Sequence, residues 1–129
     1  MLEVKLSGDL VRILREELYG SVVFKHADSL TAGIPDISVT FQGRTTWIET
    51  KVARPRVKDR EIQRLRLKQL WLAGQNAYYV VYDIHNKWTF IYNPLQYTQF
   101  LASGNHSLLM SANPGIDHLS VASFIRGLS

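Results

Sequence analysis

The stretch "GIPDISVTFQGRTTWIETKV", residues 33–52, decides the predicted fold because it has the pattern of one β-hairpin. Apolar and polar residues alternate with period two on both sides of "QG" at 42–43, where glycine suits a two-residue turn. Closing the hairpin there pairs each earlier residue with the one whose number brings the sum to 85. Asp36 then lies opposite Glu49, on the same face as Lys51.

The two faces of this hairpin differ in chemistry. The carboxylate face also carries Ser38, Thr40, Thr45 and Trp47, whereas the other face is apolar and carries Ile37, Val39, Phe41, Ile48 and Val52. Two carboxylates with Cβ atoms about 5 Å apart repel each other unless a cation lies near them. Lys51 and a divalent ion are the two candidates, and oxygen-only ligands favour Mg²⁺ or Mn²⁺. The alternative is a surface hairpin with an ordinary Glu49–Lys51 pair and Asp36 as a turn residue.

Composition excludes several other classes of protein and site. The chain has 129 residues, 46% hydrophobic and 20% charged, as expected for one globular domain over residues 1–129. It has no cysteine, so disulfides, thiolate nucleophiles and Cys-ligated zinc are excluded. The first residues are charged and lack a secretory apolar region, and no apolar run reaches the length of a membrane span. We therefore expect a cytoplasmic protein.

The net charge of +4 is concentrated in one segment. Between Lys51 and Lys68, eight basic residues face only two acidic ones, for a local net charge of +6. Such a segment predicts a polyanionic partner, the alternative being a solvated helix face. The residues expected to contact phosphates, rather than to read bases, are Arg54, Arg56, Lys58, Arg60, Arg64 and Arg66.

The order of predicted elements indicates an α/β fold. Apolar spacing predicts helices over residues 9–19 and 58–73, a helix from Pro94, and a C-terminal helix over 117–128. Strands are predicted over 21–26, 36–41, 45–52, 77–84 and 87–92. The order α-β-β-β-α-β-β, followed by C-terminal helices, predicts a mixed central sheet flanked by helices.

"GIPD" and "WIETK" resemble the two halves of the PD-(D/E)XK nuclease signature. Their spacing and flanking residues are most similar to the virus-type replication-repair nuclease (VRR-NUC) family. In that family a helix bearing a glutamine and then an apolar strand follow the signature, and Gln63 and "AYYVVYD" match these two features. The resemblance covers about residues 9–92, which leaves residues 93–129 as a helical extension of the domain.

The resemblance implies a restriction-endonuclease-like core and a metal-dependent endonuclease. Asp36, Glu49 and the Thr50 backbone carbonyl would be ligands of Mg²⁺ or Mn²⁺, Lys51 would be catalytic, and Gln63 would position a water or phosphate. Members of the family, like the archaeal Holliday-junction resolvases they resemble, usually carry a further ligand, a glutamate early in the first helix. Asp9 is the expected counterpart here, one methylene shorter, and Glu17 is the alternative.

We therefore expect an endonuclease that hydrolyses DNA phosphodiester bonds, with branched or Holliday-junction DNA as substrate in replication, repair or recombination. His26, which flanks the hairpin, is a further candidate DNA contact. The resemblance also implies a homodimer, and a compact stand-alone domain of this family suggests a phage or prophage protein acting in the host cytoplasm.

Three alternatives remain at this point. A restriction-type duplex endonuclease is one, although 129 residues leave little room for a target-recognition subdomain. An inactive nuclease-derived DNA-binding module is another, although Asp36, Glu49 and Lys51 are all present. A structural phage protein with a coincidental match would leave the basic segment unexplained.

Overall fold

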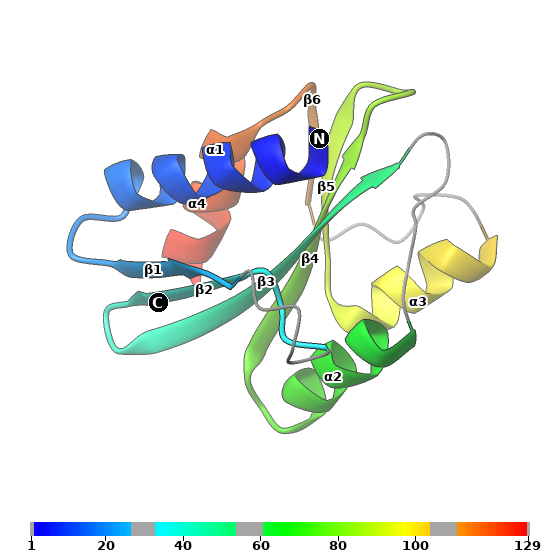
Figure 1. Ribbon diagram of the computed structural model, residues 1–129, viewed down its shortest axis with the longest axis horizontal. Coiled ribbons are helices and arrows are strands. Elements are labelled where there is room, and N and C mark those ends of the chain that lie inside the picture. The colour runs from blue at the N-terminus through cyan, green and yellow to red at the C-terminus, as the bar shows by residue number, and fades with distance from the viewer. Residues whose placement is uncertain (1, 27–32, 54–60, 104–110, 129) are drawn as a thin grey trace.

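The computed structural model describes residues 2–26, 33–53, 61–103 and 111–128 of the chain. Within these ranges lie four helices and six strands (Figure 1). In chain order they are α1 (Leu2–Glu17), β1 (Val22–Lys25), β2 (Ile37–Phe41), β3 (Arg44–Ala53), α2 (Glu61–Leu72), β4 (Asn76–Asp83), β5 (Trp88–Tyr92), α3 (Pro94–Ser103), β6 (Ser111–Pro114) and α4 (His118–Gly127).

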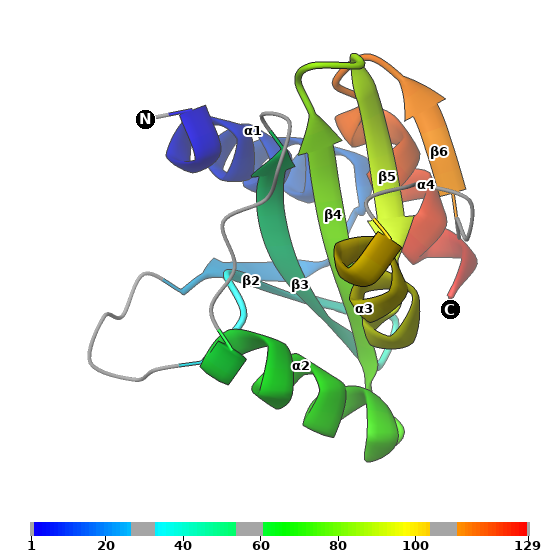
Figure 2. The same cartoon turned by 90° about the vertical axis from the view of Figure 1, so that its right-hand side faces the viewer.

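The strands form one mixed sheet in the order of the sequence, β1 to β6. β3 and β4 are parallel, and every other neighbouring pair is antiparallel. A parallel pair needs a crossover connection, and α2 lies within that connection. Helices α1 and α4 cover one face of the sheet and α2 and α3 the other (Figures 1 and 2). The predicted α/β class with a mixed, helix-flanked sheet is confirmed.

Two hydrophobic cores fill the space between the sheet and its two helical layers. The core under α1 and α4 contains Leu6, Leu10, Leu14, Ile37, Val39, Ile48, Val121 and Ile125. The core under α2 and α3 contains Leu67, Tyr79, Val81, Phe90, Tyr92, Tyr97 and Phe100. Strand β4 serves both cores, because successive side chains of a strand point to opposite faces. Its continuous apolar sequence follows from this double burial.

The hairpin register is the one that the sequence predicts. Ile37 pairs with Ile48 and Phe41 with Arg44, so the paired numbers sum to 85. Gln42 and Gly43 both have positive φ, at 52° and 77°, which defines a type I′ turn. The twist of this turn matches that of the strands, and it therefore holds Asp36 and Glu49 in register.

Polar side chains close the N-termini of the last two helices. Asn93 and Gln96 bond reciprocally to each other's backbone N–H groups, a capping box that starts α3 at the predicted Pro94. Asp117 accepts the Ser120 N–H at 3.0 Å and starts α4. Both C-terminal helices are thus specified locally by the sequence.

The structure differs from the predicted elements at two places. The first helix begins at Leu2 rather than at residue 9, because the apolar stripe of Leu6 and Leu10 packs on the sheet across Gly8. That packing outweighs the cost of about 1 kcal/mol for a glycine within a helix. The C-terminal segment is also not wholly helical: β6 pairs with β5 and extends the sheet. The four residues of β6 do not alternate between apolar and polar side chains, so the sequence did not predict a strand there.

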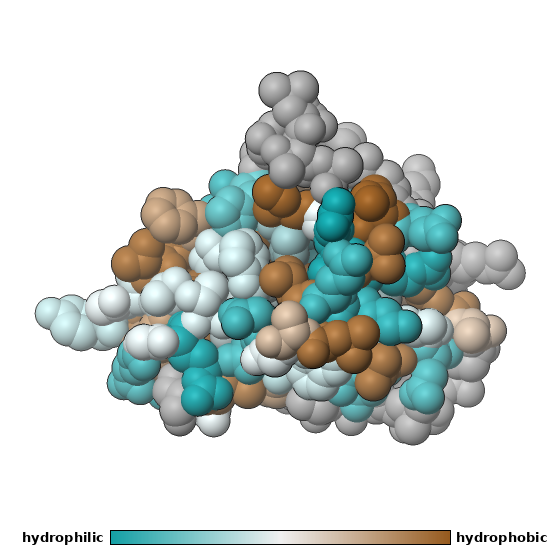
Figure 3. Space-filling model, turned by 90° about the horizontal axis from the view of Figure 1, so that it is seen from below, coloured by the Kyte–Doolittle hydropathy of each residue, from teal (hydrophilic) through white to brown (hydrophobic). Residues whose placement is uncertain are grey.

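The surface is mixed in character. On the face seen in Figure 3, apolar and hydrophilic side chains are interspersed in small groups. Among the helices that the structure describes, none has the length and apolarity needed to cross a membrane. Ile125 of α4 lies in the core under α1 and α4, and the partly buried Phe124 packs against that core.

The turn provides a test of the hairpin. Asparagine tolerates the left-handed conformation better than glutamine does, so Gln42→Asn should raise the free energy of unfolding by about 0.5–1 kcal/mol. Chemical denaturation measures this. Gln75→Asn, at an exposed position whose φ is not positive, should leave the free energy of unfolding nearly unchanged. Equal effects of the two substitutions would contradict the turn assignment.

Candidate functional site

Asp36 and Glu49 meet at the open end of the hairpin. The Asp36 backbone N–H donates to Glu49 Oε1 at 3.1 Å, and Glu49 is only 3% exposed. The backbone N–H and the hydroxyl of Thr50 both donate to Asp36 Oδ2, at 3.0 and 2.7 Å. These three bonds orient both carboxylates. Among the described residues, the recorded hydrogen bonds to the Asp36 carboxylate are accepted by Oδ2 and not by Oδ1.

Lys51 joins this pair to helix α2. Its side chain is buried, and its Nζ donates to Gln63 Oε1 at 2.9 Å while lying 3.4 Å from Glu49 Oε2. Gln63 reaches Lys51 because the crossover that contains α2 returns along this face of the sheet. The structure thus brings together Asp36, Glu49, Thr50, Lys51 and Gln63, as the sequence predicts.

Burial makes this site electrostatically demanding. Desolvation, followed by the charge of Asp36, raises the pKa of Glu49 to about 8. Lys51 and the Asp36 N–H act in the opposite direction without cancelling the rise in pKa. A site with carboxylate and carbonyl oxygens offers the hard ligands that Mg²⁺ and Mn²⁺ prefer.

Glu3, an exposed residue in the first turn of α1, is a candidate that the sequence analysis missed. Desolvation raises its pKa, the charge of Lys51 opposes this rise, and the charge of Asp36 adds to it. Glu3 therefore lies within electrostatic range of the hairpin carboxylates. The helical spacing of Leu2, Leu6 and Leu10 indicates that the first helix begins near residue 2, and this pattern could have identified Glu3 from the sequence.

The structure does not bring Asp9 or Glu17 to the carboxylate pair, and this corrects the expectation for both. Asp9 lies within the helix and accepts a hydrogen bond from Lys5 at 3.1 Å. Glu17 lies in the last turn, with its carboxylate 4.0 Å from the guanidinium of Arg126. Asp9 was expected near the site because the helix was expected to begin there, which places its first turn too late in the chain.

His26 lies at the edge of the site. Its backbone N–H donates to the Asp36 carbonyl at 2.6 Å, its Nε2 lies 2.8 Å from Ser38 Oγ, and its ring stacks on Trp47. Of the predicted phosphate contacts, Arg64 and Arg66 lie on α2, whereas Arg54, Arg56, Lys58 and Arg60 lie outside the described residues. Within the described ranges, no three His, Asp or Glu side chains form a compact metal-binding cluster.

The segment before Asp36 begins at Gly33, where the backbone requires a glycine. Its φ is +88°, and a Cβ there would lie 2.5 Å from Arg66 Cγ and 3.1 Å from the Ile62 carbonyl oxygen. Only glycine combines this conformation with so close an approach to α2. The segment that carries Pro35 and Asp36 is therefore held against the helix that carries Gln63.

No protein-family model matches this chain, and no curated protein sequence does. Its structure is similar to the 1.6 Å structure of Archaeoglobus fulgidus Hjc, a Holliday junction resolvase from an archaeal hyperthermophile. The TM-score is 0.52 at 16% sequence identity, over 74% of this chain and 75% of that chain. The likeness shows a shared fold, and the restriction-endonuclease-like architecture expected from the sequence is confirmed.

The raised pKa of Glu49 predicts that Glu49 lowers the free energy of unfolding by an amount that depends on pH. Between about pH 4.5 and 8 the unfolded chain ionises Glu49 while the folded chain keeps the proton, so stability falls as the pH rises. Glu49→Gln removes the penalty. In EDTA its advantage over wild type in free energy of unfolding should be about 4 kcal/mol larger at pH 8.5 than at pH 4.5.

Thermal and urea unfolding across this pH range would measure the difference. Glu16→Gln, at an exposed position on α1, is the matched control and should change stability little at any pH. A Glu49→Gln effect that does not vary with pH would contradict the buried, proton-holding state of Glu49.

Proposed function

We propose that this protein is a divalent-metal-dependent endonuclease of the PD-(D/E)XK type that hydrolyses DNA phosphodiester bonds. The observation that carries the proposal is the hydrogen-bonded array of Asp36, Glu49, Lys51 and Gln63, in which Glu49 and Lys51 are buried, on a restriction-endonuclease-like fold. The structural likeness to a Holliday junction resolvase supports branched DNA as the substrate class. The hairpin motif favours the VRR-NUC family within this type.

The residues present fit a hard divalent cation. Asp36 and Glu49 would hold Mg²⁺ or Mn²⁺ together with the Thr50 carbonyl, and Glu3 would add negative charge from α1. The carboxylates are already oriented by the Thr50 and Asp36 N–H groups, so little side-chain freedom remains to be lost on binding. The bound metal would supply stabilisation of the negative charge that develops on the phosphate oxygens.

Lys51 is the residue placed to act on the reacting atoms. Burial and the bond to Gln63 hold its ammonium beside the carboxylates, where it can bind a phosphate oxygen or orient a water molecule for in-line attack. Gln63 positions Lys51 and presents an amide N–H₂ to the same space. Thr50 acts through Asp36, whose Oδ2 it binds twice.

The charge of the chain supports a nucleic-acid substrate. The segment from Lys51 to Lys68 has a net charge of +6, and Arg66 places part of this charge on the exposed surface of α2. Phosphate contacts of this kind bind without reading sequence, which suits a nuclease selective for DNA shape. Paired cuts across a junction require two sites, so a homodimer is part of the proposal, as is a phage or prophage origin.

Cleavage assays test the catalytic role of Lys51. A labelled four-way junction, a flap and a linear duplex would each be incubated with Mg²⁺, Mn²⁺ or EDTA. Wild type should cut only with metal, and Lys51→Ala should reduce the rate at saturating DNA by about 100-fold or more, because a group at the reacting atoms is lost. Preference for the duplex would indicate the restriction-type alternative.

Lys68→Ala is the matched control, because it removes the same charge from an exposed position in the same segment. It should weaken binding slightly and leave the rate at saturation unchanged. Binding without cutting in any metal would overturn the proposal in favour of an inactive DNA-binding module.

Glu3 and Asp9 provide a second comparison. If Glu3 supplies the carboxylate from α1, Glu3→Gln should weaken Mn²⁺ binding about tenfold, because a partner of the metal site is neutralised. Asp9→Asn, which neutralises a carboxylate on the same helix but away from the pair, should leave Mn²⁺ affinity unchanged. Isothermal titration would measure both affinities, and a larger effect at Asp9 would contradict the placement of the site.

A further inference from the structure

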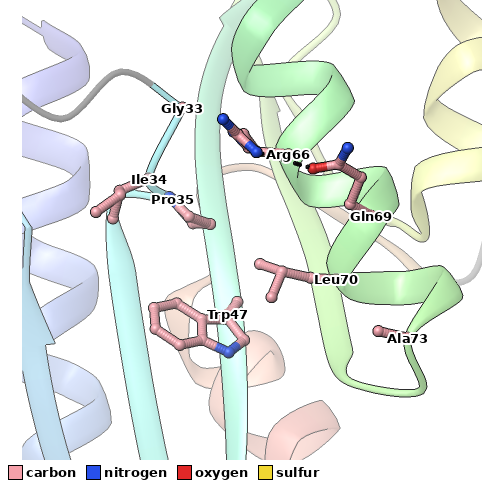
Figure 4. A pocket seen from close by; sticks show the side chains of 8 residues that line it. All are labelled: Gly33, Ile34, Pro35, Trp47, Arg66, Gln69, Leu70 and Ala73. Atoms are coloured by element: carbon pink, nitrogen blue, oxygen red, sulfur yellow. Dashed lines mark hydrogen bonds between the residues drawn. The ribbon is translucent and has the colours of Figure 1, made fainter.

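A pocket of about 440 Å³ lies between the hairpin and α2, beside the carboxylate pair (Figure 4). Its size is within the range of pockets that bind small molecules or single groups of larger ligands. The wall on the hairpin side is formed mainly by Ile34, Pro35 and Trp47. The opposite wall is formed mainly by Arg66, Gln69 and Leu70 of α2. None of the roles proposed above uses this pocket.

The chemistry of the pocket suits a flat ring attached to a phosphate. Figure 4 shows the Trp47 ring on one side and Leu70 on the other, with Arg66 and Gln69 at the rim near Gly33. Arg66 Nη1 donates to Gln69 Oε1 at 3.2 Å, and both side chains are exposed. A nucleobase offers two apolar faces for such walls and a polar edge for an amide or guanidinium.

An aromatic row leads to this pocket across the sheet. The row consists of Phe24, His26 and Trp47, with ring centroids 6.3 Å apart for Phe24 and His26, and 5.9 Å apart for His26 and Trp47. Phe24 is 58% exposed on β1, the edge strand of the sheet. His26 and Trp47 are half-buried. A row of accessible rings at stacking distance is the usual platform for single-stranded nucleic acid, and it favours a strand over a free small molecule.

The spacing joins the pocket to the cleavage site. Trp47 precedes Glu49 by two residues on the same face of β3, which is about 7 Å along the strand. Stacked bases in one strand are separated by about 3.4 Å, so a spacing of twice that value fits neighbouring nucleotides that have unstacked. Pro35, on the pocket wall, is adjacent in sequence to Asp36.

We propose that this pocket binds one unpaired nucleobase next to the phosphate that the metal and Lys51 would bind at the cleavage site. This inference rests on the proposed nuclease function and refines its substrate. A base within a fully paired duplex is not available to the pocket, whereas the first unpaired nucleotide of a flap or branch point is. The protein should therefore select sites where paired and unpaired DNA meet, through stacking rather than sequence.

Binding to a fluorescent base analogue tests the pocket directly. A flap with 2-aminopurine as the first unpaired nucleotide, and a duplex with 2-aminopurine paired, would be titrated with protein in EDTA so that no cleavage occurs. Wild type should quench the unpaired probe and not the paired one. Trp47→Leu should bind the flap about tenfold more weakly and abolish the quenching, whereas its duplex affinity should stay within about twofold of wild type.

Three further variants separate stacking from folding. Trp47→Phe keeps an aromatic face and should restore flap binding to within about threefold of wild type. Trp88→Leu replaces an exposed tryptophan on β5, across the sheet from the pocket, and its flap binding and quenching should equal those of wild type. Arg66→Gln alters only the exposed rim, so it tests the pocket even if Trp47→Leu unfolds, and it should weaken flap binding more than duplex binding.

Equal losses on flap and duplex in Trp47→Leu, or quenching that persists without Trp47, would overturn the pocket proposal. So would unchanged flap selectivity in Arg66→Gln. The two proposals fail separately, because this assay needs no cleavage. If quenching depends on Trp47 but the protein cuts no DNA, the pocket proposal is supported and the nuclease proposal is overturned. If the protein cuts DNA with metal but shows no such quenching, the nuclease proposal is supported and the pocket proposal is overturned.

Discussion

The burial of one carboxylate, Glu49, next to a second, half-buried one, Asp36, is the constraint on which the rest of the site depends. Glu49 is almost wholly removed from water beside Asp36, at a cost that appears as the raised pKa of Glu49. Backbone and hydroxyl donors from Asp36 and Thr50 offset part of this cost and hold both groups in one geometry. Lys51 leaves the compensation incomplete, because the pKa of Glu49 stays raised.

This constraint makes the hairpin register critical. A slip of one residue would move Glu49 and Lys51 to the apolar face, where neither could be solvated or paired. The type I′ turn at Gln42 and Gly43 and the apolar ladder of Ile37 and Ile48 both oppose such a slip. The stability of the sheet and the integrity of the site are therefore determined by the same contacts.

The remaining parts of the site come from helices that the cores position. α2 brings Gln63 to Lys51 and forms one wall of the Trp47 pocket, and the close approach of Gly33 sets the distance between that wall and the hairpin. α1 brings Glu3 toward the site from the other face. Because α4 packs against α1 in the same core, α4 supports the site through α1.

The sequence by itself determined the hairpin, its register and its two faces, the buried strand β4, and the placement of Asp36, Glu49 and Lys51. These follow from turn chemistry and short periodicities, which act between residues close in the chain. Only the tertiary structure decided that Gln63 reaches Lys51, that β6 extends the sheet, and that Trp47 and Leu70 line a pocket. Each of these depends on packing between segments distant in sequence, and no local pattern encodes such packing.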